Sequence, residues 1–486
     1  MRKPQDNIHI PLLIKPCRPD KFPAIHLYFY TGMKTICIIG GGFSGSATAM
    51  RLLEKDPEAR IVLVNGGQPL IRGIAYSTTG EEHLLNVPAG RMGILASAPA
   101  HFTDWLRSKP EYSHLIADNL AQSFLPRMVY GVYLQEQLNQ YSGHKNLEII
   151  ASKAISVSVH TGRYVVRLEN TQAVTADHLV LALGNFLPAT PKIANSAVFD
   201  NTHYFRNPWN NDYLKDIRNN ETVLLIGTGL TMVDCVLSLK KINFKGKIIA
   251  VSPRGYIPAS HTNAAPYPDF SEELKDKSLR EIFKIVRQHL EVAYENDLAW
   301  QAVIDSIRPY AQQIWLSLDK KGKQQFTSHL RHIWGVARHR LPEAIFAQIM
   351  DAVNSGQLEI IGGRVQNIEE EHTGFRVSIR PRKSHEQQTL QVTRIVNCTG
   401  PQINYAEIGD PFVKSLIENN IIRPDGLKMG IAATPAGQVL GADEKPVKNV
   451  YAIGSLLRGV LWETTAVPEI RVQAENVARQ ICESIN

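Results

Sequence analysis

Two glycine turns, each lying between an apolar run and a helical pattern, constrain the fold of this chain more than any other feature. The first turn, residues 40–45, follows the apolar run 35–39, and the second, residues 227–229, follows the run 222–226. In this order of strand, turn and helix, backbone N–H groups at a helix N-terminus lie where a pyrophosphate can bind. The sequence therefore predicts an α/β fold with two Rossmann-like dinucleotide-binding domains, one for a flavin and one for a nicotinamide donor.

The first turn carries the complete G-x-G-x-x-G pattern, whose glycines allow a tight turn and a close approach of ligand to backbone. The next apolar run, 60–64, ends at Asn65, where an acidic residue usually holds the adenosine ribose. Because an amide can also bond to a hydroxyl group, we expect FAD here. The alternative is a glycine-rich turn without a ligand. The residues predicted to contact FAD are Gly40, Gly42, Phe43, Ser44, Gly45 and Asn65.

The second turn is shorter, because Met232 stands where the third glycine would be. The apolar run 247–251 follows it and leads into Ser252 and Arg254. A hydroxyl and a guanidinium suit the 2′-phosphate of NADPH, whereas NAD-binding proteins carry an acid at this point. We therefore expect NADPH rather than NADH; an ordinary surface arginine is the alternative. The residues predicted to contact NADPH are Gly227, Gly229, Thr231, Ser252 and Arg254.

Composition limits the partners of this chain. Its 486 residues are 44% hydrophobic and 20% charged, which is typical of a globular protein of two or three domains. The formal net charge of +7 is spread along the chain, and the short basic cluster 380–383 is interpreted as a solvated loop. The sequence contains no nucleic-acid-binding motif and no apolar run of membrane-spanning length. We expect a small-molecule substrate as partner, and neither nucleic acid nor a membrane.

The five cysteines are widely spaced and form no C-x-x-C motif. This spacing favours a reducing, cytoplasmic location, and it argues against a metal site and against the close dithiol of a disulfide reductase. Cys37, Cys235 and Cys398 lie in apolar stretches and are interpreted as core packing residues.

The order of the patterns predicts a first domain that is interrupted by the second. Residues 33–210 form the first part of the FAD-binding domain, residues 211–355 form the NAD(P)H-binding domain with a helical segment at 271–353, and residues 356–486 return to the first domain. Residues 1–32 contain five prolines and no continuous apolar stretch, so we interpret them as an N-terminal extension without a role in the fold.

Local patterns add detail to these domains. Alternation on both sides of a Thr161-Gly162 turn predicts a hairpin over 154–168, and Ser278 with Glu281 forms a capping box at the start of a helix. The elements expected in the returning part are strands at 358–361, 374–379, 394–398 and 449–453 and a helix at 467–482.

Several separate stretches resemble one known family. They are residues 73–77, 83–89, 91–92, 126–127, 130–133, 227–234, 338–340 and 462–471. Together they are similar to a bacterial family of FAD/NAD(P)-binding oxidoreductases that includes FAD-dependent urate hydroxylases, and the similarity covers most of residues 33–486. The resemblance implies the architecture of a flavoprotein monooxygenase.

The resemblance also implies further cofactor contacts. In such proteins a strand-to-glycine segment such as Leu183-Gly184 or Thr399-Gly400 crosses near a nucleotide. The last strand ends in Gly-Asp, whose carboxylate binds the ribityl chain. This chain has Gly454 and Ser455 there, and the serine can supply one hydrogen bond.

Two more contacts follow from the same architecture. A helix that begins at Val467 and Pro468 would direct its positive end at the reduced flavin. Arg127 is expected to bind a cofactor phosphate or the substrate, with a surface ion pair as the alternative.

A monooxygenase needs a water-poor pocket beside its flavin. His83, His261 and His339 are candidate acids or bases, because imidazole titrates near neutrality; a structural role is the alternative for each. The insertion 66–130 and the helices at 271–350 are expected to shape the pocket. The residues predicted to form its walls are Asn86, Arg91, Trp462 and Glu463.

Three functions fit these patterns. The first is an NADPH-dependent FAD monooxygenase that inserts oxygen from O₂ into a small molecule. The second is an FAD-linked reductase or dehydrogenase without oxygen insertion, and the third is a non-catalytic nucleotide sensor. Coupled oxygen consumption separates the first two, and failure to bind either cofactor favours the third.

Overall fold

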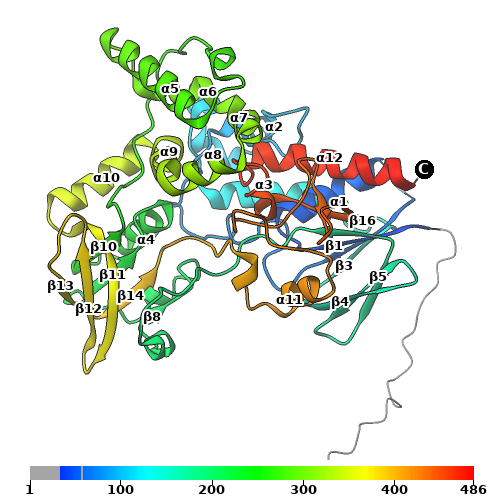
Figure 1. Cartoon of the computed structure of the whole chain (residues 1–486), viewed down its shortest axis with the longest axis horizontal. Helices are drawn as coiled ribbons and strands as arrows, with labels where there is room; N and C mark the ends of the chain where they lie inside the picture. The colour runs from blue at the N-terminus through cyan, green and yellow to red at the C-terminus, as the bar shows by residue number, and fades with distance from the viewer. Residues whose placement is uncertain (1–32, 56–57, 486) are drawn as a thin grey trace, which may run out of the picture. The chain divides into compact units, whose positions relative to one another are not determined.

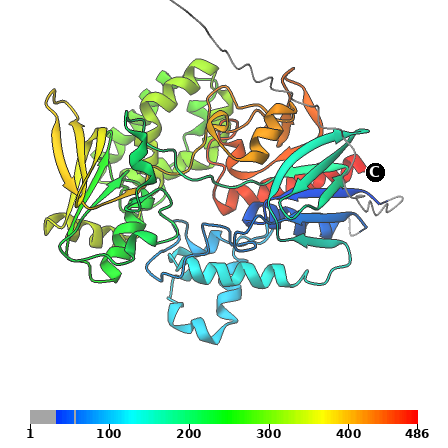
Figure 2. The same ribbon diagram turned by 90° about the horizontal axis from the view of Figure 1, so that it is seen from below.

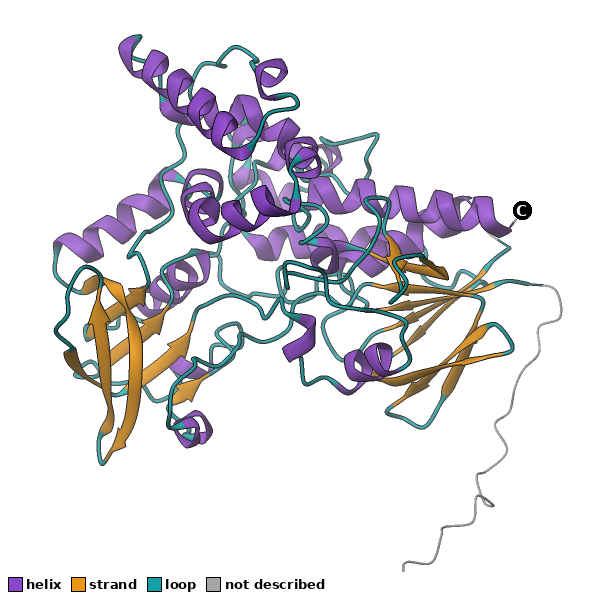
Figure 3. Cartoon of the chain, viewed as in Figure 1, coloured by secondary structure: helices purple, strands orange, loops and turns teal. Residues whose placement is uncertain are grey.

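The first glycine turn follows an inner strand of a six-stranded sheet (Figures 1 and 3). The computed structural model describes residues 33–55 and 58–485, so the expectation for residues 1–32 lies outside the described residues. The strands run in the order β15-β16-β7-β1-β2-β3 and are parallel, except that β15 is antiparallel to β16. Their bounds are β1 Thr35–Ile39, β2 Arg60–Val64, β3 Leu147–Ile150, β7 His178–Leu181, β15 Gln438–Leu440 and β16 Pro446–Ala452.

Layers on both faces of this sheet explain why every residue of β1 is buried. Ile36 and Ile38 pack into the helical layer and Cys37 and Ile39 into the opposite layer, because successive strand residues point to opposite faces. The helical layer holds α1 (Phe43–Lys55), α3 (Arg127–Asn139) and α12 (Val467–Ile485), which lie side by side in Figure 1. The opposite layer holds β4 (Ala154–His160), β5 (Arg163–Leu168), β6 (Ala173–Ala176) and α11 (Pro411–Glu418).

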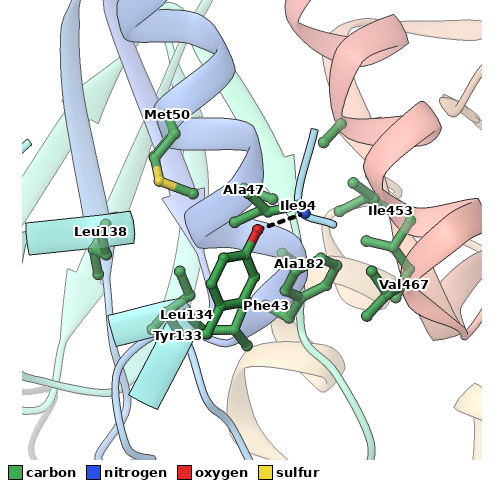
Figure 4. Close-up of a cluster of buried hydrophobic side chains, with 14 of the residues drawn as sticks. Phe43, Ala47, Met50, Ile94, Tyr133, Leu134, Leu138, Ala182, Ile453 and Val467 are labelled. Carbon is green, nitrogen blue, oxygen red and sulfur yellow. Dashed lines mark hydrogen bonds between the residues drawn. The ribbon is translucent and has the colours of Figure 1, made fainter. Parts of the chain in front are cut away.

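The insertion between β2 and β3 is anchored on the helical layer. It contains α2 (His101–Arg107). The Ile94 backbone N–H donates to the Tyr133 hydroxyl over 3.1 Å, and His101 Nδ1 lies 2.8 Å from the same oxygen. Figure 4 shows Tyr133 within the apolar cluster that also contains Ile453 and Val467. The loop that follows β2 is therefore held next to the start of α12.

A seven-stranded second sheet carries the second glycine turn, in the order β13-β12-β11-β10-β9-β14-β8. Strands β8, β14, β9, β10 and β11 are parallel, whereas β11, β12 and β13 are antiparallel neighbours. Helices α4 (Leu230–Lys241) and α10 (Glu343–Asn354) cover one face. The strand bounds are β8 Tyr204–Phe205, β9 Thr222–Ile226, β10 Lys247–Ser252, β11 Leu358–Glu371, β12 Gly374–Pro381, β13 Gln388–Val392 and β14 Arg394–Asn397.

The second domain is inserted in the first, as expected, but its limits differ from the prediction. The strands expected at 358–361, 374–379 and 394–398 occur, yet all three belong to the second sheet, so the return predicted at residue 356 is wrong. The chain re-enters the core of the first domain only at Tyr405 and Ile408, ahead of α11. Apolar alternation identifies a strand but not its partner, and pairing of β11 with β10 and of β14 with β9 decided the sheet.

A helical extension lies between β10 and α10 in the chain. In Figure 2 the second sheet lies on the left of the view and the first sheet on the right. The predicted capping box is present, since Ser278 Oγ accepts from the Glu281 N–H and the Glu281 carboxylate accepts from the Ser278 N–H. No helix among the described residues is both long and apolar enough to span a membrane. The helices are α5 Leu279–Glu295, α6 Trp300–Ile307, α7 Ala311–Ser317, α8 Lys320–Gln325 and α9 Arg331–Arg338.

Candidate functional site

The first glycine turn has a backbone that only glycine can follow at two of its positions. Gly40 has φ +112°, and a Cβ on it would lie 2.1 Å from the Ala182 carbonyl oxygen. A Cβ on Gly45 would lie 1.9 Å from the Gly40 carbonyl oxygen. Gly42 differs, because the nearest atom to its Cβ position is the Gly73 Cα at 3.7 Å. The turn is thus packed against β7 on one side and open to a ligand on the other.

A cavity of about 360 Å³ lies on that open side. It brings together chain segments that are far apart in sequence: the turn itself, the end of β2, the loop after it, the end of β7 and the loop before α12. The 13-residue helix α1 begins at its wall, so backbone N–H groups and the positive helix end face the cavity. The lining residues that matter below are Gly40, Gly42, Phe43, Ser44, Asn65, Tyr76, Gly184, Ser455 and Thr465.

Asn65 and Ser455 both line this cavity, as predicted. Asn65 Nδ2 donates to the Gln68 carbonyl over 2.8 Å, and its Oδ1 lies 2.9 Å from the Cβ position of Gly41, so the amide oxygen is directed at the turn. Ser455 Oγ donates to the Gly184 carbonyl, which leaves the hydroxyl oxygen able to accept one bond. The cavity therefore presents an acceptor at each of the two positions where the pattern has a carboxylate.

Other predicted flavin contacts lie behind the lining. Gly45 packs inside the turn, and Val467 has its side chain in the apolar core. Pro468 stands in the first turn of α12, two positions before the lining residue Ile470. Gly454 has φ +76°, and a Cβ on it would lie 2.8 Å from Ser44 Oγ, so it allows the last strand to approach the turn. These residues position the cavity rather than line it.

The second glycine turn repeats the geometry of the first. Gly227 has φ +122°, and a Cβ on it would lie 2.4 Å from the Cys398 carbonyl oxygen. Gly229 caps α4 and has no atom within 4 Å of its Cβ position; Thr231 follows in the first turn of that helix. Gly400, with φ +83°, comes just after β14 and thus belongs to this turn and not to the FAD cavity.

Two guanidinium groups meet at the end of β10. Hydrogen bonds from Arg382 and from Arg254 hold the pKa of the Tyr256 phenol below its ordinary value. Arg382 reaches this point because its N–H donates to the Gly362 carbonyl over 2.7 Å, and Gly362 pairs with Ser252 across β10 and β11. Arg382 is exposed in a turn, in agreement with the interpretation of 380–383 as a solvated loop, but its guanidinium group also reaches Tyr256. A hairpin returns it to the end of β10, and no sequence spacing indicates that return.

The Ser252 hydroxyl is already engaged within the protein. Its Oγ lies 2.8 Å from Thr228 Oγ1 and accepts from the Gly255 N–H over 3.1 Å. It ties the second turn to the end of β10. Arg254 and Arg382 carry the positive charge at this end of the site.

Arg127 does not point at the FAD cavity. Its Nη1 forms an ion pair with Asp234 of α4 at 2.7 Å, and its Nε donates to the Leu84 carbonyl over 2.9 Å. Asn86 lies in the same region, beside a gap of about 20 Å³ between the insertion and α4. The assignments of Arg127 to a cofactor and of Asn86 to the substrate pocket are corrected accordingly: Arg127 joins the two domains, and Asn86 lines the gap between them.

His83 belongs to that same junction. Its Nε2 lies 3.0 Å from Ser238 Oγ, and its Nδ1 contacts Thr78 Oγ1. His261 packs edge-on against Phe124, and burial followed by the nearby Arg340 lowers its pKa. These contacts favour, for both histidines, the structural role that was the alternative to acid or base catalysis.

Trp462 and Glu463 lie between the cavity and the helical extension. Trp462 packs at a tilt against Trp315 and edge-on against Phe326, with ring centroids 5.2 and 5.0 Å away. Glu463 accepts from Trp334 Nε1 over 2.7 Å and pairs with Arg338 Nε at 2.9 Å. Thr465, two residues after Glu463, lines the cavity. Trp462 and Glu463, both predicted as wall residues, therefore hold in place the loop that carries this lining residue.

The charges around Glu463 keep its carboxyl group ionised near pH 7. Burial would raise the pKa of the Glu463 carboxyl, but Arg338 and His339 outweigh it and hold that pKa below its ordinary value. Burial lowers the pKa of His339 to about 4, so its imidazole is neutral near pH 7 and is not a general acid there. Arg91 is exposed, and its carbonyl accepts from Arg471 Nη1 over 3.2 Å.

The sequence patterns did not predict one contact, which is between two cysteines. Cys235 Sγ of α4 lies 3.7 Å from Cys398 Sγ, although the two residues are 163 positions apart. Both are buried, and burial raises the pKa of the Cys398 thiol well above its ordinary value. The pair packs beneath the second turn, where a substrate disulfide has no access, so it serves as core as expected.

Comparison with known proteins agrees with this geometry. Residues 37–186, which surround the first turn and the cavity, match the model of a family described as FAD-NAD(P)-binding. No curated protein matches the chain by sequence. The match covers this part of the chain and does not single out urate hydroxylases; the whole chain has an α/β fold of two domains with parallel sheets, shared with the solved structures below.

Solved structures share the fold across both domains. An ornithine N-hydroxylase from Kutzneria sp. 744 has a TM-score of 0.67 and 14% identity, over 93% of this chain and 100% of that one. L-lysine 6-monooxygenase from Pseudomonas syringae has a TM-score of 0.63 and 14% identity, over 93% and 99%. Bacillithiol disulfide reductase from Staphylococcus aureus has a TM-score of 0.56 and 13% identity, over 93% and 98%. At these identities the likeness concerns the fold alone.

Proposed function

We propose that this protein is an FAD-dependent monooxygenase that is reduced by NADPH and hydroxylates a small molecule with O₂. The cavity at the first glycine turn carries the proposal. It combines a helix N-terminus for a pyrophosphate, a turn that is open at Gly42, and acceptors at Asn65 and Ser455. These features fit FAD, and the family match covers the turn, α1 and Asn65.

Each part of the cavity has one task in this proposal. The N-terminus of α1 binds the pyrophosphate, Asn65 accepts from the adenosine ribose, and Ser455 accepts from the ribityl chain. The loop held by Glu463 excludes water from the side that faces the helical extension. Bound FAD would supply the transfer of electrons from NADPH to oxygen.

The second turn is the proposed NADPH site. The N-terminus of α4 after Gly229 binds the pyrophosphate, and Arg254 with Arg382 binds the 2′-phosphate. Two guanidinium groups favour NADPH over NADH, because the hydroxyl of NADH leaves both charges without a partner.

Oxygen insertion draws support from two of the similar structures. The ornithine N-hydroxylase from Kutzneria, described with reduced FAD, NADP⁺ and L-ornithine, and the L-lysine 6-monooxygenase both align over 93% of this chain. Their names describe oxygen insertion into small amino acids. A small molecule as substrate follows by analogy with them.

A reductase without oxygen insertion is the second candidate, since the bacillithiol disulfide reductase shares the fold. Reduction of a disulfide through a protein dithiol needs an accessible cysteine pair. The close pair in this structure, Cys235 and Cys398, is buried beneath the second turn. This burial favours the monooxygenase.

The absorbance spectrum of the purified protein, followed without oxygen as NADPH or NADH is added, tests the cofactors. We expect flavin bands that NADPH bleaches much faster than NADH. A colourless protein that FAD cannot reconstitute would contradict the enzyme and favour the sensor. Reoxidation with ¹⁸O₂ then tests the reaction: label in the organic product supports the monooxygenase, whereas product formation without label supports the reductase.

A further inference from the structure

Charged side chains from three elements meet beside the FAD cavity. Arg308 follows α6, Arg338 ends α9, and Arg458 lies in the loop after β16. Glu463 lies further along that loop, and Glu469 lies in the first turn of α12. Gln312 Nε2 of α7 donates to the Glu463 carbonyl over 2.8 Å, and Trp315 Nε1 donates to the Gly459 carbonyl over 3.2 Å, so the segment after Arg308 packs on the loop that carries Arg458 and Glu463. Arg308 and Arg338 both act to lower the pKa of the two carboxyl groups. The charge of Arg91 also contributes to lowering the pKa of Arg308. We refer to Arg91, Arg308, Arg338 and Arg458 as the arginine cluster.

Most of the hydrogen-bonding capacity of the arginine cluster is unused. Arg338 pairs with Glu463 at 2.9 Å. The guanidinium groups of Arg91, Arg308 and Arg458 form no hydrogen bond or ion pair with another of the described residues. Glu469 Oε2 is buried and also has no hydrogen-bond partner there. The donors are therefore available to a ligand.

The charges of this region do not balance. Four guanidinium groups face two carboxylates, and His339 is neutral because burial lowers its pKa to about 4. Burial, followed by Arg338 and Arg91, lowers the pKa of Arg308; burial, followed by Arg331, lowers that of Arg458. Arg91 is exposed, but Arg338 is buried and Arg308 and Arg458 are partly buried, and cations crowded in this way destabilise the folded chain unless an anion joins them.

The cluster adjoins the site of the proposed chemistry. Thr465 lines the FAD cavity and lies between Glu463 and Glu469 in the chain. The charge of Glu469 also contributes to raising the pKa of the hydroxyl of Tyr76, another lining residue. The N-terminus of α12 contributes the positive end of a 19-residue helix to the same region. A ligand held here would extend toward the cavity.

We propose that the arginine cluster binds the oxyanion of an acidic substrate, a carboxylate or a phosphate, with Arg308 and Arg458 as its direct partners. Guanidinium groups bind both oxyanions through paired N–H donors. Glu463 is a positioning residue, because it holds Arg338 and the loop rather than the ligand. This inference rests on the proposed function, since the ligand is taken to be the molecule that is oxidised.

Calorimetric titration of the purified full chain tests the proposal, with flavin content recorded for each preparation. The probes are benzoate, succinate and inorganic phosphate, with benzamide as the neutral counterpart of benzoate. We expect at least one anion to bind and benzamide not to bind. Arg308→Gln weakens the binding about ten- to a hundredfold, as for loss of a charge-assisted hydrogen bond. Arg287→Gln, on the exposed face of α5, leaves it unchanged. Arg458→Gln and Arg308→Lys repeat the test if Arg308→Gln fails to fold.

The outcomes separate this inference from the proposed function. A flavin-containing protein that NADPH reduces but that binds none of the three anions overturns the arginine cluster and leaves the monooxygenase standing. A colourless protein that binds an anion through Arg308 overturns the monooxygenase and leaves the arginine cluster as an anion site. Competition between the anion and NADPH would assign the cluster to the coenzyme and overturn the proposal. Preference among benzoate, succinate and phosphate identifies the carboxylate or the phosphate as the source of the charge.

Discussion

The two glycine turns share the order of strand, turn and helix, yet their surroundings differ. At both turns a glycine with positive φ approaches a carbonyl of the neighbouring strand, Gly40 toward Ala182 and Gly227 toward Cys398. The first turn lines a cavity of about 360 Å³ that several other chain segments, distant in sequence, complete. At the second turn the Cβ position of Gly229 has no atom within 4 Å.

This difference separates a retained cofactor from one that is exchanged. A ligand enclosed by several segments loses most of its contact with water, and its dissociation is slow. A ligand on an exposed turn keeps a shorter residence time, which suits a coenzyme that leaves after each reduction. The local motif determines where a dinucleotide binds, and the surrounding segments determine how long it stays.

Gly40→Ala is expected to have the largest effect on this comparison. Its backbone has φ +112°, and its new Cβ would lie 2.1 Å from the Ala182 oxygen. A left-handed conformation alone costs alanine about 1–2 kcal/mol, and the contact adds to it. We expect the ratio of flavin to protein, measured by absorbance after purification, to fall at least about tenfold.

The matched changes for this test are Gly227→Ala and Gly335→Ala. Gly227→Ala meets the Cys398 oxygen at 2.4 Å and should abolish reduction by NADPH while FAD remains bound. Gly335 lies in α9 with no atom within 4 Å of its Cβ position, so its alanine variant should keep both cofactors. Loss of FAD from Gly227→Ala would show that the two turns are not independent sites.

Glu463→Gln tests how firmly the first site is closed. The change leaves the buried Arg338 without its carboxylate, which costs roughly 3 kcal/mol near pH 7. Because the pKa of Glu463 is lower in the folded chain than its ordinary value, the stabilisation is present at neutral pH. It is lost as pH falls through the folded pKa, where Glu463 becomes protonated. Urea denaturation at stepwise lower pH should therefore show the two proteins converging.

Glu469→Gln is the contrasting variant, six residues along the chain. Burial raises the pKa of Glu469, although Arg338 opposes the shift, so its ionisation destabilises the fold as pH rises through that pKa. We expect this variant to be no less stable than the parent near pH 7. Equal destabilisation by both glutamine variants would contradict the separate roles given to the two carboxyl groups.

Arg382→Ala tests the selectivity of the second site. Loss of one of two guanidinium groups should raise the KM for NADPH about ten- to a hundredfold and leave the KM for NADH unchanged. Arg380→Ala, at an exposed position of β12 two residues earlier, serves as the control. An equal loss with both coenzymes would mean that Arg382 supports the fold of this end of the sheet rather than the phosphate.

Asn65→Asp is expected to have the smallest effect. A carboxylate accepts a stronger hydrogen bond from the adenosine ribose than an amide does, so FAD affinity should rise roughly three- to tenfold. Titration of the stripped protein with FAD measures it. A decrease instead would show that the bond from Asn65 Nδ2 to the Gln68 carbonyl is the main contribution of this side chain.

Particular residues show how far the sequence could reach. Gly40 and Asn65 were found from spacing, because strand, turn and helix lie next to one another in the chain, whereas Ser455 was found from the family resemblance; all three line the cavity. The strands at 358–398 were also found, but not their sheet, since a strand's alternation does not identify its neighbour. Arg382 and the cysteine pair were missed because pairing of distant strands brings them to their sites.

The sequence by itself determined the α/β class, the two dinucleotide turns and the insertion of one domain in the other. These depend on local order: short-range periodicity and the backbone freedom of a few glycines. Only the tertiary structure decided that the first turn lines a cavity, that Arg127 pairs with Asp234, and that Arg338 pairs with Glu463. Such contacts join residues that are distant in sequence, and their energies depend on burial and on neighbouring charges that exist only once the chain has folded.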